Sequence, residues 1–142
     1  MSHWTQVKTL QLDIIALACL VALCGGALLW GCSQAHAPNE LSVLVPDRVR
    51  TALDEMDRRG LTEWAEYGRS IASCVTYGGE MPGFWAYTDL SGKSRIYVSD
   101  RWVRADVGDR GLVLLHEIWH AQTGIVSHPQ ELTDLLAMYR KG

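Results

Sequence analysis

The sequence has almost no cysteine outside its N-terminal segment. Of its four cysteines, Cys19, Cys24 and Cys32 lie in or directly after an apolar N-terminal run, and Cys74 is alone in the rest of the chain. No disulfide framework can therefore form within the folded part, and no C-x-x-C zinc site exists there. We interpret Cys74 as a small, buried side chain on a helix.

The charged residues show no bias that would select a polyanionic partner. Thirteen Lys and Arg stand against sixteen Asp and Glu, the formal net charge is −3, and the two signs are interspersed. The absence of a basic stripe excludes a nucleic-acid-binding protein, and the absence of a long acidic run excludes a disordered acidic tail. No internal repeat is visible, and 142 residues leave room for one domain.

Residues 14–30 contain no charged side chain and are almost wholly apolar. This length fits the apolar region of a secretory signal and is slightly short for a comfortable membrane span. Lys8 precedes the run, and the next basic residue after it is Arg48, a distribution that favours a domain outside the cytoplasm. We expect residues 1–31 to be a signal or anchor segment.

The end of this run, Leu28-Leu29-Trp30-Gly31-Cys32, resembles a bacterial lipoprotein signal, in which a small residue precedes a cysteine that becomes lipidated. The alternative is an uncleaved signal anchor. Residues 32–40 are polar and indicate a tether. Either alternative predicts a membrane-anchored, extracytoplasmic protein, in the periplasm or on the cell surface, most simply a bacterial lipoprotein.

The remainder, residues 41–142, is expected to form one small α+β domain with helices packed on a short β-hairpin or sheet. Helical spacing of apolar residues predicts helices at residues 46–59, 62–74, 110–123 and 129–140. Aromatic and β-branched runs predict strands at residues 84–88 and 95–99, and residues 78–83 are expected to be a loop. For the third helix, Asp106 and Asp109 are both candidate N-caps and Gly124 is the expected stop.

The third predicted helix carries the sequence His116-Glu117-Ile118-Trp119-His120. Residues four apart share a helix face, so His116 and His120 can present two imidazoles to one ion. Glu117 lies about 100° further around the helix, from where its carboxylate can reach a water molecule at the metal more easily than the metal itself. This pattern predicts a zinc site with Glu117 as the general base.

The five residues resemble the active-site helix of the zincin metallopeptidases. A helix, a strand hairpin, the motif helix and a further acidic helix together resemble a minimal gluzincin-like domain, over roughly residues 84–142. The resemblance implies a Zn²⁺ cofactor and a peptide or protein substrate. It also implies that a strand beside the motif helix can bind an extended substrate, although this hairpin could equally just cover the core.

A catalytic zinc site takes three protein ligands, and the sequence leaves the third one open. Glu131 fits the gluzincin arrangement, in which a Glu on a following helix completes the site, and we select it as the third ligand. Asp134 follows it on the same helix face. His128 is the remaining candidate, but it comes two residues later than the corresponding histidine of the metzincins.

Two functions follow from this interpretation. The first is a zinc-dependent peptidase that hydrolyses peptide bonds outside the cytoplasm, near the membrane. The second is a non-catalytic, membrane-anchored lipoprotein whose metal site is structural or vestigial and which acts as an interaction factor. Glu117 favours the enzyme, because a purely structural site needs no base beside its histidines.

Overall fold

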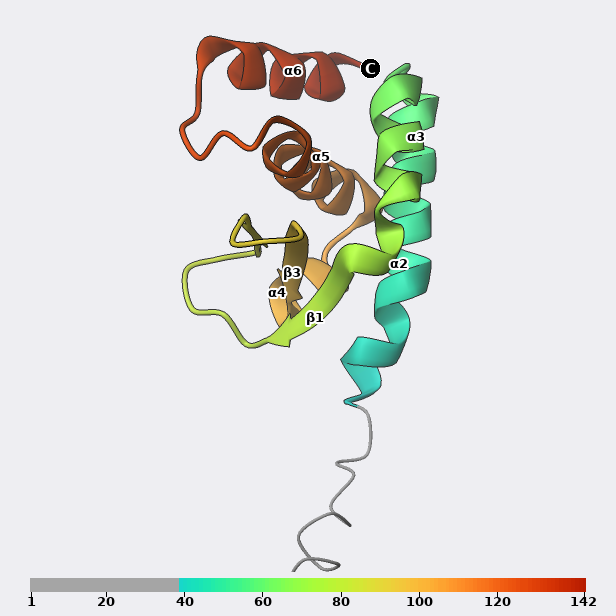
Figure 1. Ribbon diagram of the computed structural model, residues 1–142. Helices are drawn as coiled ribbons and strands as arrows, with labels where there is room; N and C mark the ends of the chain where they lie inside the picture. The colour runs from blue at the N-terminus through green and yellow to red at the C-terminus, as the bar shows by residue number, and fades with distance from the viewer. Residues whose placement is uncertain (1–38) are drawn as a thin grey trace, which may run out of the picture. The chain divides into compact units, whose positions relative to one another are not determined.

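The computed structural model describes residues 39–142, which form an α+β fold (Figure 1). Its helices are α2 (Glu40–Arg58), α3 (Thr62–Ser70), α4 (Asp100–Arg104), α5 (Val107–Thr123) and α6 (Gln130–Lys141), with a 3₁₀ turn, η1 (Ala72–Cys74). Its strands are β1 (Val75–Gly79), β2 (Ala86–Asp89) and β3 (Arg95–Ser99). No helix of this part is long and apolar enough to cross a membrane. The predicted signal or anchor, and Cys32 with it, lies outside the described residues.

Helix α2 begins six residues before the predicted start at Pro46, and that boundary was wrong. Asn39 caps the helix, because its side-chain oxygen accepts a hydrogen bond from the backbone N–H of Leu41 at 3.0 Å. Pro46 therefore lies inside the helix, where it removes one backbone donor. Helices α2 and α3 pack against each other and form one side of the domain (Figure 1).

The three strands form one mixed sheet in the order β1-β3-β2. Strands β2 and β3 pair antiparallel, with Ala86 opposite Val98, so the predicted hairpin is confirmed. Strand β1, which pairs parallel with β3, was not predicted: the expected helix ends at Ser70 and the expected loop is partly strand. This order leaves β2 at one edge of the sheet, next to α5.

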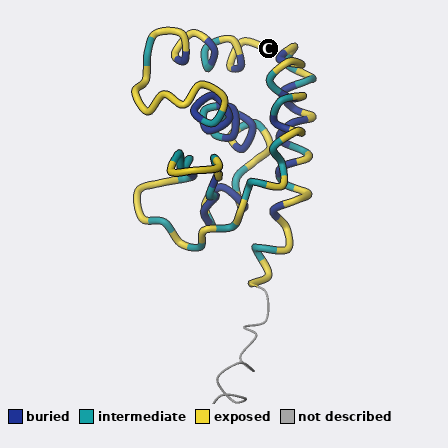
Figure 2. The backbone as a smooth tube through the Cα atoms, viewed as in Figure 1, coloured by how far each residue is buried: buried dark blue, intermediate teal, exposed yellow. Residues whose placement is uncertain are grey.

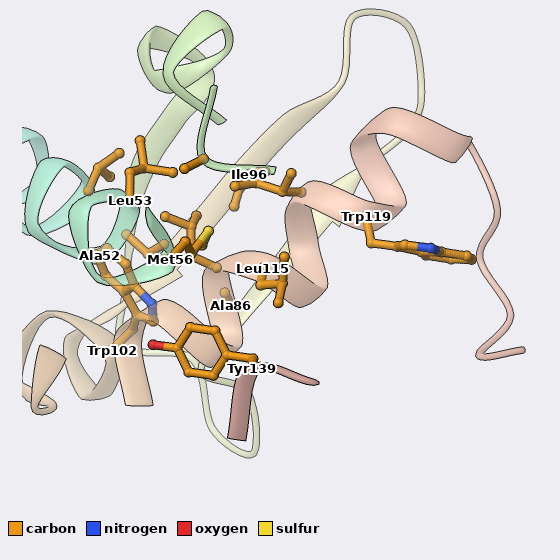
Figure 3. Packing of buried hydrophobic residues seen from close by; sticks show 14 of the residues in the cluster. Ala52, Leu53, Met56, Ala86, Ile96, Trp102, Leu115, Trp119 and Tyr139 are labelled. Carbon is orange, nitrogen blue, oxygen red and sulfur yellow. The ribbon is translucent and has the colours of Figure 1, made fainter. Parts of the chain in front are cut away.

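Helix α5 runs through the hydrophobic core. Its side chains Leu114, Leu115 and Ile118 are at most 1% exposed and pack with residues of α2, the sheet and α6. Figure 2 shows α5 as largely buried, while the outer faces of α2 and α6 are exposed. Figure 3 shows Leu115 close to Met56 of α2 and Ala86 of β2, with Trp119 further along the helix. A helix held on several sides is a rigid support for a site.

Helix α6 packs against α5 through an unusually close approach at Gly111. A Cβ atom at Gly111 would lie only 2.0 Å from the Tyr139 hydroxyl oxygen, so no larger residue fits unless the Tyr139 side chain moves. The same hydroxyl donates a hydrogen bond to the backbone oxygen of Gly108 at 2.8 Å. Arg59, at the end of α2, donates to the Tyr139 backbone oxygen at 2.8 Å and so ties α6 to α2 as well.

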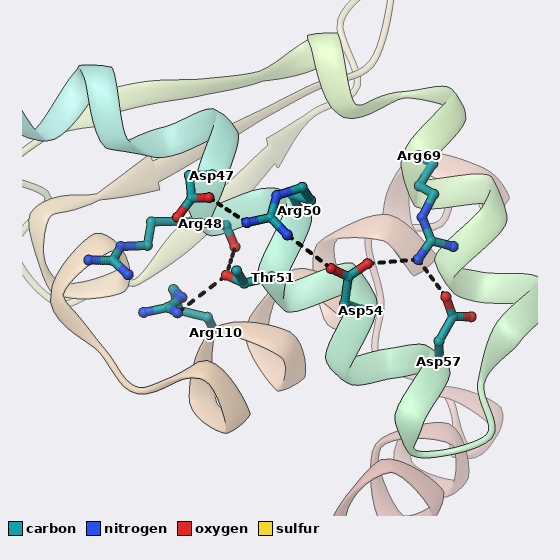
Figure 4. Close-up of polar contacts among 8 residues, drawn as sticks. All are labelled: Asp47, Arg48, Arg50, Thr51, Asp54, Asp57, Arg69 and Arg110. Atoms are coloured by element: carbon teal, nitrogen blue, oxygen red, sulfur yellow. Dashed lines mark hydrogen bonds and ion pairs between the residues drawn. The ribbon is translucent and has the colours of Figure 1, made fainter.

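The outer surface of α2 carries polar contacts that are mostly exposed (Figure 4). Arg50 pairs with Asp47 at 2.6 Å and with Asp54 at 3.3 Å. Arg69 of α3 pairs with Asp54 and Asp57 and so joins the two helices. Exposed pairs of this kind contribute little stability, so the core carries most of it.

Candidate metal centre

The sequence of α5 fixes both ends of the helix that carries the motif. Asp106 is the N-cap, and its side chain accepts a hydrogen bond from the backbone N–H of Asp109 at 2.9 Å, which decides between the two predicted caps. Gly124 ends the helix with φ 70°, a conformation that favours glycine. The predicted helix is thus confirmed, and His116 and His120 lie one turn apart on the same face.

Three imidazole nitrogens converge at the C-terminal end of α5. The Nε2 atom of His120 lies 3.0 Å from that of His116 and 3.3 Å from that of His128, and the last two are 3.1 Å apart. Three nitrogens bound tetrahedrally to zinc at about 2.0–2.1 Å would be separated by roughly 3.3–3.4 Å. The spacing is therefore close to that of three ligands of one tetrahedral ion.

The orientation of His120 is set by the loop that follows the helix. Its Nδ1 atom lies 2.5 Å from the backbone oxygen of Ile125 and must donate a hydrogen to it, because a carbonyl oxygen only accepts. In the neutral ring this leaves the lone pair on Nε2, the atom that faces the other two histidines. The loop thereby selects the tautomer that a metal requires.

The arrangement of the three histidines is suited to bind a metal ion. Burial, together with the neighbouring His120 and His128, lowers the pKa of His116 to about 4, so this ring is neutral near pH 7. Three neutral imidazoles could not satisfy all three close nitrogen contacts with hydrogen bonds, because each would have only one N–H and that of His120 faces the Ile125 backbone oxygen. A cation shared by the three lone pairs would satisfy all of them, and imidazole ligands suit zinc and several other transition metals.

Glu117 lies beside this cluster and is held by the sheet. Its side chain is buried, and its Oε2 atom lies 2.6 Å from the hydroxyl of Thr88 on β2. The same hydroxyl lies 3.0 Å from the Glu117 backbone oxygen. Burial raises the pKa of the Glu117 carboxyl above its ordinary value, although the hydrogen bond from Thr88 opposes the shift. A fixed carboxylate of raised pKa is suited to accept a proton.

The histidines and Glu117 open into a cavity of about 420 Å³ between α5, β2 and the loop after α5. Its other walls are largely apolar, and the exposed side chains Phe84, Tyr87 and Val126 stand at its rim. A concave apolar site with a few convergent polar groups is typical of a binding or active site.

The predicted third ligand, Glu131, is not part of the cluster. Glu131 is exposed on the first turn of α6, and Asp134 accepts a hydrogen bond from Gln130 at 2.8 Å on the same exposed face. His128, the remaining candidate, completes the group instead. Fixed motif spacing argued against His128, but a loop of irregular backbone can hold two additional residues and still return its histidine to the helix.

Comparison with known proteins does not extend this description: no protein-family model, no curated protein and no solved structure matches the chain.

Proposed function

We propose that the protein is a zinc-dependent peptidase in which His116, His120 and His128 bind the metal and Glu117 is the general base. The observation that carries the proposal is the convergence of the three Nε2 atoms at 3.0–3.3 Å next to a buried carboxylate. A purely structural zinc site is usually closed by four protein ligands, whereas three leave a position for chemistry. Among the described residues, only these three side chains form such a group.

The side chains of the chain have separable roles in this reaction. A bound Zn²⁺ would supply Lewis acidity, which polarises a carbonyl group and lowers the pKa of a nearby water molecule. Glu117 would take the proton of the attacking water on its carboxylate and deliver it to the amine that leaves. Thr88 would hold the carboxylate in place through its 2.6 Å hydrogen bond. The largely apolar walls would limit the access of bulk water.

The edge strand β2 offers a way to bind an extended peptide. It pairs with β3 on one side only, and Ala86 and Thr88 of this strand line the cavity of the candidate site. A peptide added to the free edge would be held by backbone hydrogen bonds beside Glu117. This supports a peptide or protein as the substrate.

The anchored, extracytoplasmic location expected from residues 1–32 remains part of the proposal. If Cys32 is lipidated, Cys32→Ala should accumulate as an unprocessed precursor of higher mass that takes up no labelled fatty acid. Equal mass and equal labelling of the two proteins would instead identify an uncleaved anchor.

The experiment that tests the function compares the full-length protein, purified in detergent, with Glu117→Gln. Elemental analysis should find about one zinc per chain in both, because Glu117 is not a ligand. Hydrolysis of a mixed peptide library, followed by mass spectrometry, should fall roughly 10²–10⁴-fold in the variant. Zinc without hydrolysis in either protein would support the non-catalytic lipoprotein, and the absence of stoichiometric metal would overturn the peptidase.

A further inference from the structure

A second cavity, of about 300 Å³, adjoins the candidate metal centre. It shares Phe84, Ala86, His116 and Glu117 with the first cavity, so a peptide bound at the metal would reach into both. Its volume is at the lower end for pockets that hold small molecules, roughly 300–1,000 Å³. It can therefore accept about one residue of a substrate.

The walls of this second cavity come from three parts of the chain. Trp85 precedes β2, Leu112 belongs to α5, and Leu136 and Arg140 belong to α6. Most of the lining is apolar, and Arg140 is the only permanently charged cation in it. An occupant should therefore combine an apolar body with a group that pairs with a guanidinium.

Arg140 has no carboxylate partner within the described residues. None of the ion pairs of residues 39–142 includes it, and it is exposed. Asp106 and Asp109 line a neighbouring hollow together with Arg140, but neither lies within ion-pair distance of it. The one acid in the second cavity, Glu117, already accepts a hydrogen bond from Thr88.

A further positive charge lies behind the same wall. The guanidinium of Arg101 stacks over the ring of Trp85, with 4.3 Å between its Cζ atom and the ring centroid. The stacking fixes a wall of the cavity and places a second cation near it, also without an ion pair among the described residues. The charge around the cavity therefore favours an anionic occupant.

From this arrangement we infer that the second cavity binds a carboxylate of the substrate and that Arg140 determines this specificity. The carboxylate can be the free C-terminus of a peptide or the side chain of an Asp or Glu near the bond that is cleaved. A guanidinium recognises either one through charge-assisted, bidentate hydrogen bonds. The identity of the ligand as a substrate rests on the proposed peptidase function, but its binding does not.

Equilibrium binding of labelled peptides to the full-length Glu117→Gln protein tests the inference without cleavage. Three hexapeptides of Leu, Phe and Ala are compared: one with a free C-terminal carboxylate, one with a C-terminal amide, and one amide with a central Glu. At least one carboxylate form should bind about tenfold more tightly than the plain amide, the gain expected from a charge-assisted pair. The form that gains affinity identifies the source of the carboxylate.

Substitutions at two positions of the same protein assign the preference to one side chain. Arg140→Gln should reduce the ratio of affinities to about one, whereas Lys141→Gln, which removes an exposed charge one residue away and outside the cavity, should leave it unchanged. Arg140→Glu should reverse the preference toward a peptide with a central Lys. Because Arg140 is exposed, both substitutions of Arg140 should leave the thermal unfolding midpoint unchanged.

The inference would be overturned if the Glu117→Gln protein showed no preference for carboxylate peptides. It would also be overturned if the preference survived the additional substitution Arg140→Gln. The peptidase proposal fails by a different result. Selective binding of carboxylate peptides together with no hydrolysis by the protein with intact Glu117 would leave the cavity assignment standing and remove the enzyme. Hydrolysis by the protein with intact Glu117, without selective binding of carboxylate peptides, would support the peptidase and overturn the cavity assignment.

Discussion

Glu55 and the histidines of the candidate metal centre belong to two different polar clusters. The clusters differ in whether the protein itself provides hydrogen-bond partners for their charges and lone pairs. The Glu55 carboxylate accepts hydrogen bonds from Arg58 at 2.7 and 2.5 Å and from Arg59 at 2.7 Å. These partners, Arg58 first, lower the pKa of Glu55 to about 2. The protein thus supplies every partner that this acid needs.

The converging Nε2 atoms of the histidine cluster have no such partners among the described residues. The lone pair of His120 Nε2 faces two further imidazole nitrogens, and the nearby acid, Glu117, is bonded to Thr88 and not to a histidine. Polar groups that are matched within the chain serve stability, whereas unmatched ones that converge on a point indicate a ligand. Substitutions in the two clusters should therefore change different properties.

His128→Ala should have the largest effect and should separate metal binding from folding. Loss of a supporting residue around a metal ligand typically weakens binding 10–100-fold, so loss of a ligand itself should weaken zinc binding by more than about 100-fold. His128 is exposed, so the secondary structure of the metal-free protein should not change. Competition with a chelating dye and circular dichroism measure the two properties.

Ser127→Ala is the control for the same loop and should retain zinc, because Ser127 is exposed and outside the histidine group. Unchanged zinc affinity in His128→Ala would remove His128 from the proposed ligand set and reduce the centre to two histidines.

Thr88→Val should have the next largest effect and should change turnover without changing metal content. The valine keeps the shape of the side chain but removes the hydroxyl 2.6 Å from Glu117, so kcat should fall about tenfold while KM stays the same. Thr88→Ser restores a hydroxyl and should recover most of the loss. A Val variant with full kcat, or a Ser variant as slow as Val, would show that Thr88 does not position Glu117.

Glu55→Gln, in the cluster whose charges are matched within the chain, should change the stability of the fold and not the zinc content. The folded-state pKa of Glu55, about 2, is below its ordinary 4.5, so the ionised carboxylate stabilises the fold above pH 4.5 and this contribution is lost as the pH falls toward 2. The variant should be less stable by about 1 kcal/mol at pH 7, with unchanged zinc content. The difference from the parent protein should shrink below pH 4.5.

Denaturant unfolding of both proteins between pH 7 and pH 2 measures this difference. A difference that does not depend on pH would mean that Glu55 contributes by packing and not by its charge.

The parts of the fold that the sequence predicted are those with strong local signals. Helix α5 has an acidic N-cap at Asp106, a glycine stop at Gly124 and a regular apolar stripe between them, and its boundaries are close to those expected. The hairpin of β2 and β3 has aromatic and β-branched residues on both sides of a polar turn. Such signals act over a few residues and do not depend on the rest of the chain.

The parts that were missed depend on contacts between distant residues. Strand β1 contains Gly78 and Gly79, which disfavour a strand locally, and it forms because β3 pairs with it. The position of His128 likewise depends on the path of an irregular loop, which includes the contact of Ile125 with His120. The spacing of four residues on one helix predicts that His116 and His120 lie together, whereas no local spacing predicts the position of His128.

Glu131→Gln should have the smallest effect and decides between the ligand predicted from the sequence and the one that the structure suggests. Glu131 is exposed on the first turn of α6 and outside the histidine group, so its loss should change zinc affinity and kcat by no more than about twofold. Asp134→Asn, on the same exposed face, should behave in the same way. The same dye competition and peptide hydrolysis used for His128→Ala allow a direct comparison. If Glu131→Gln lost zinc while His128→Ala kept it, the first turn of α6 would have to approach α5 when metal binds, and Glu131 would replace His128 as the third ligand.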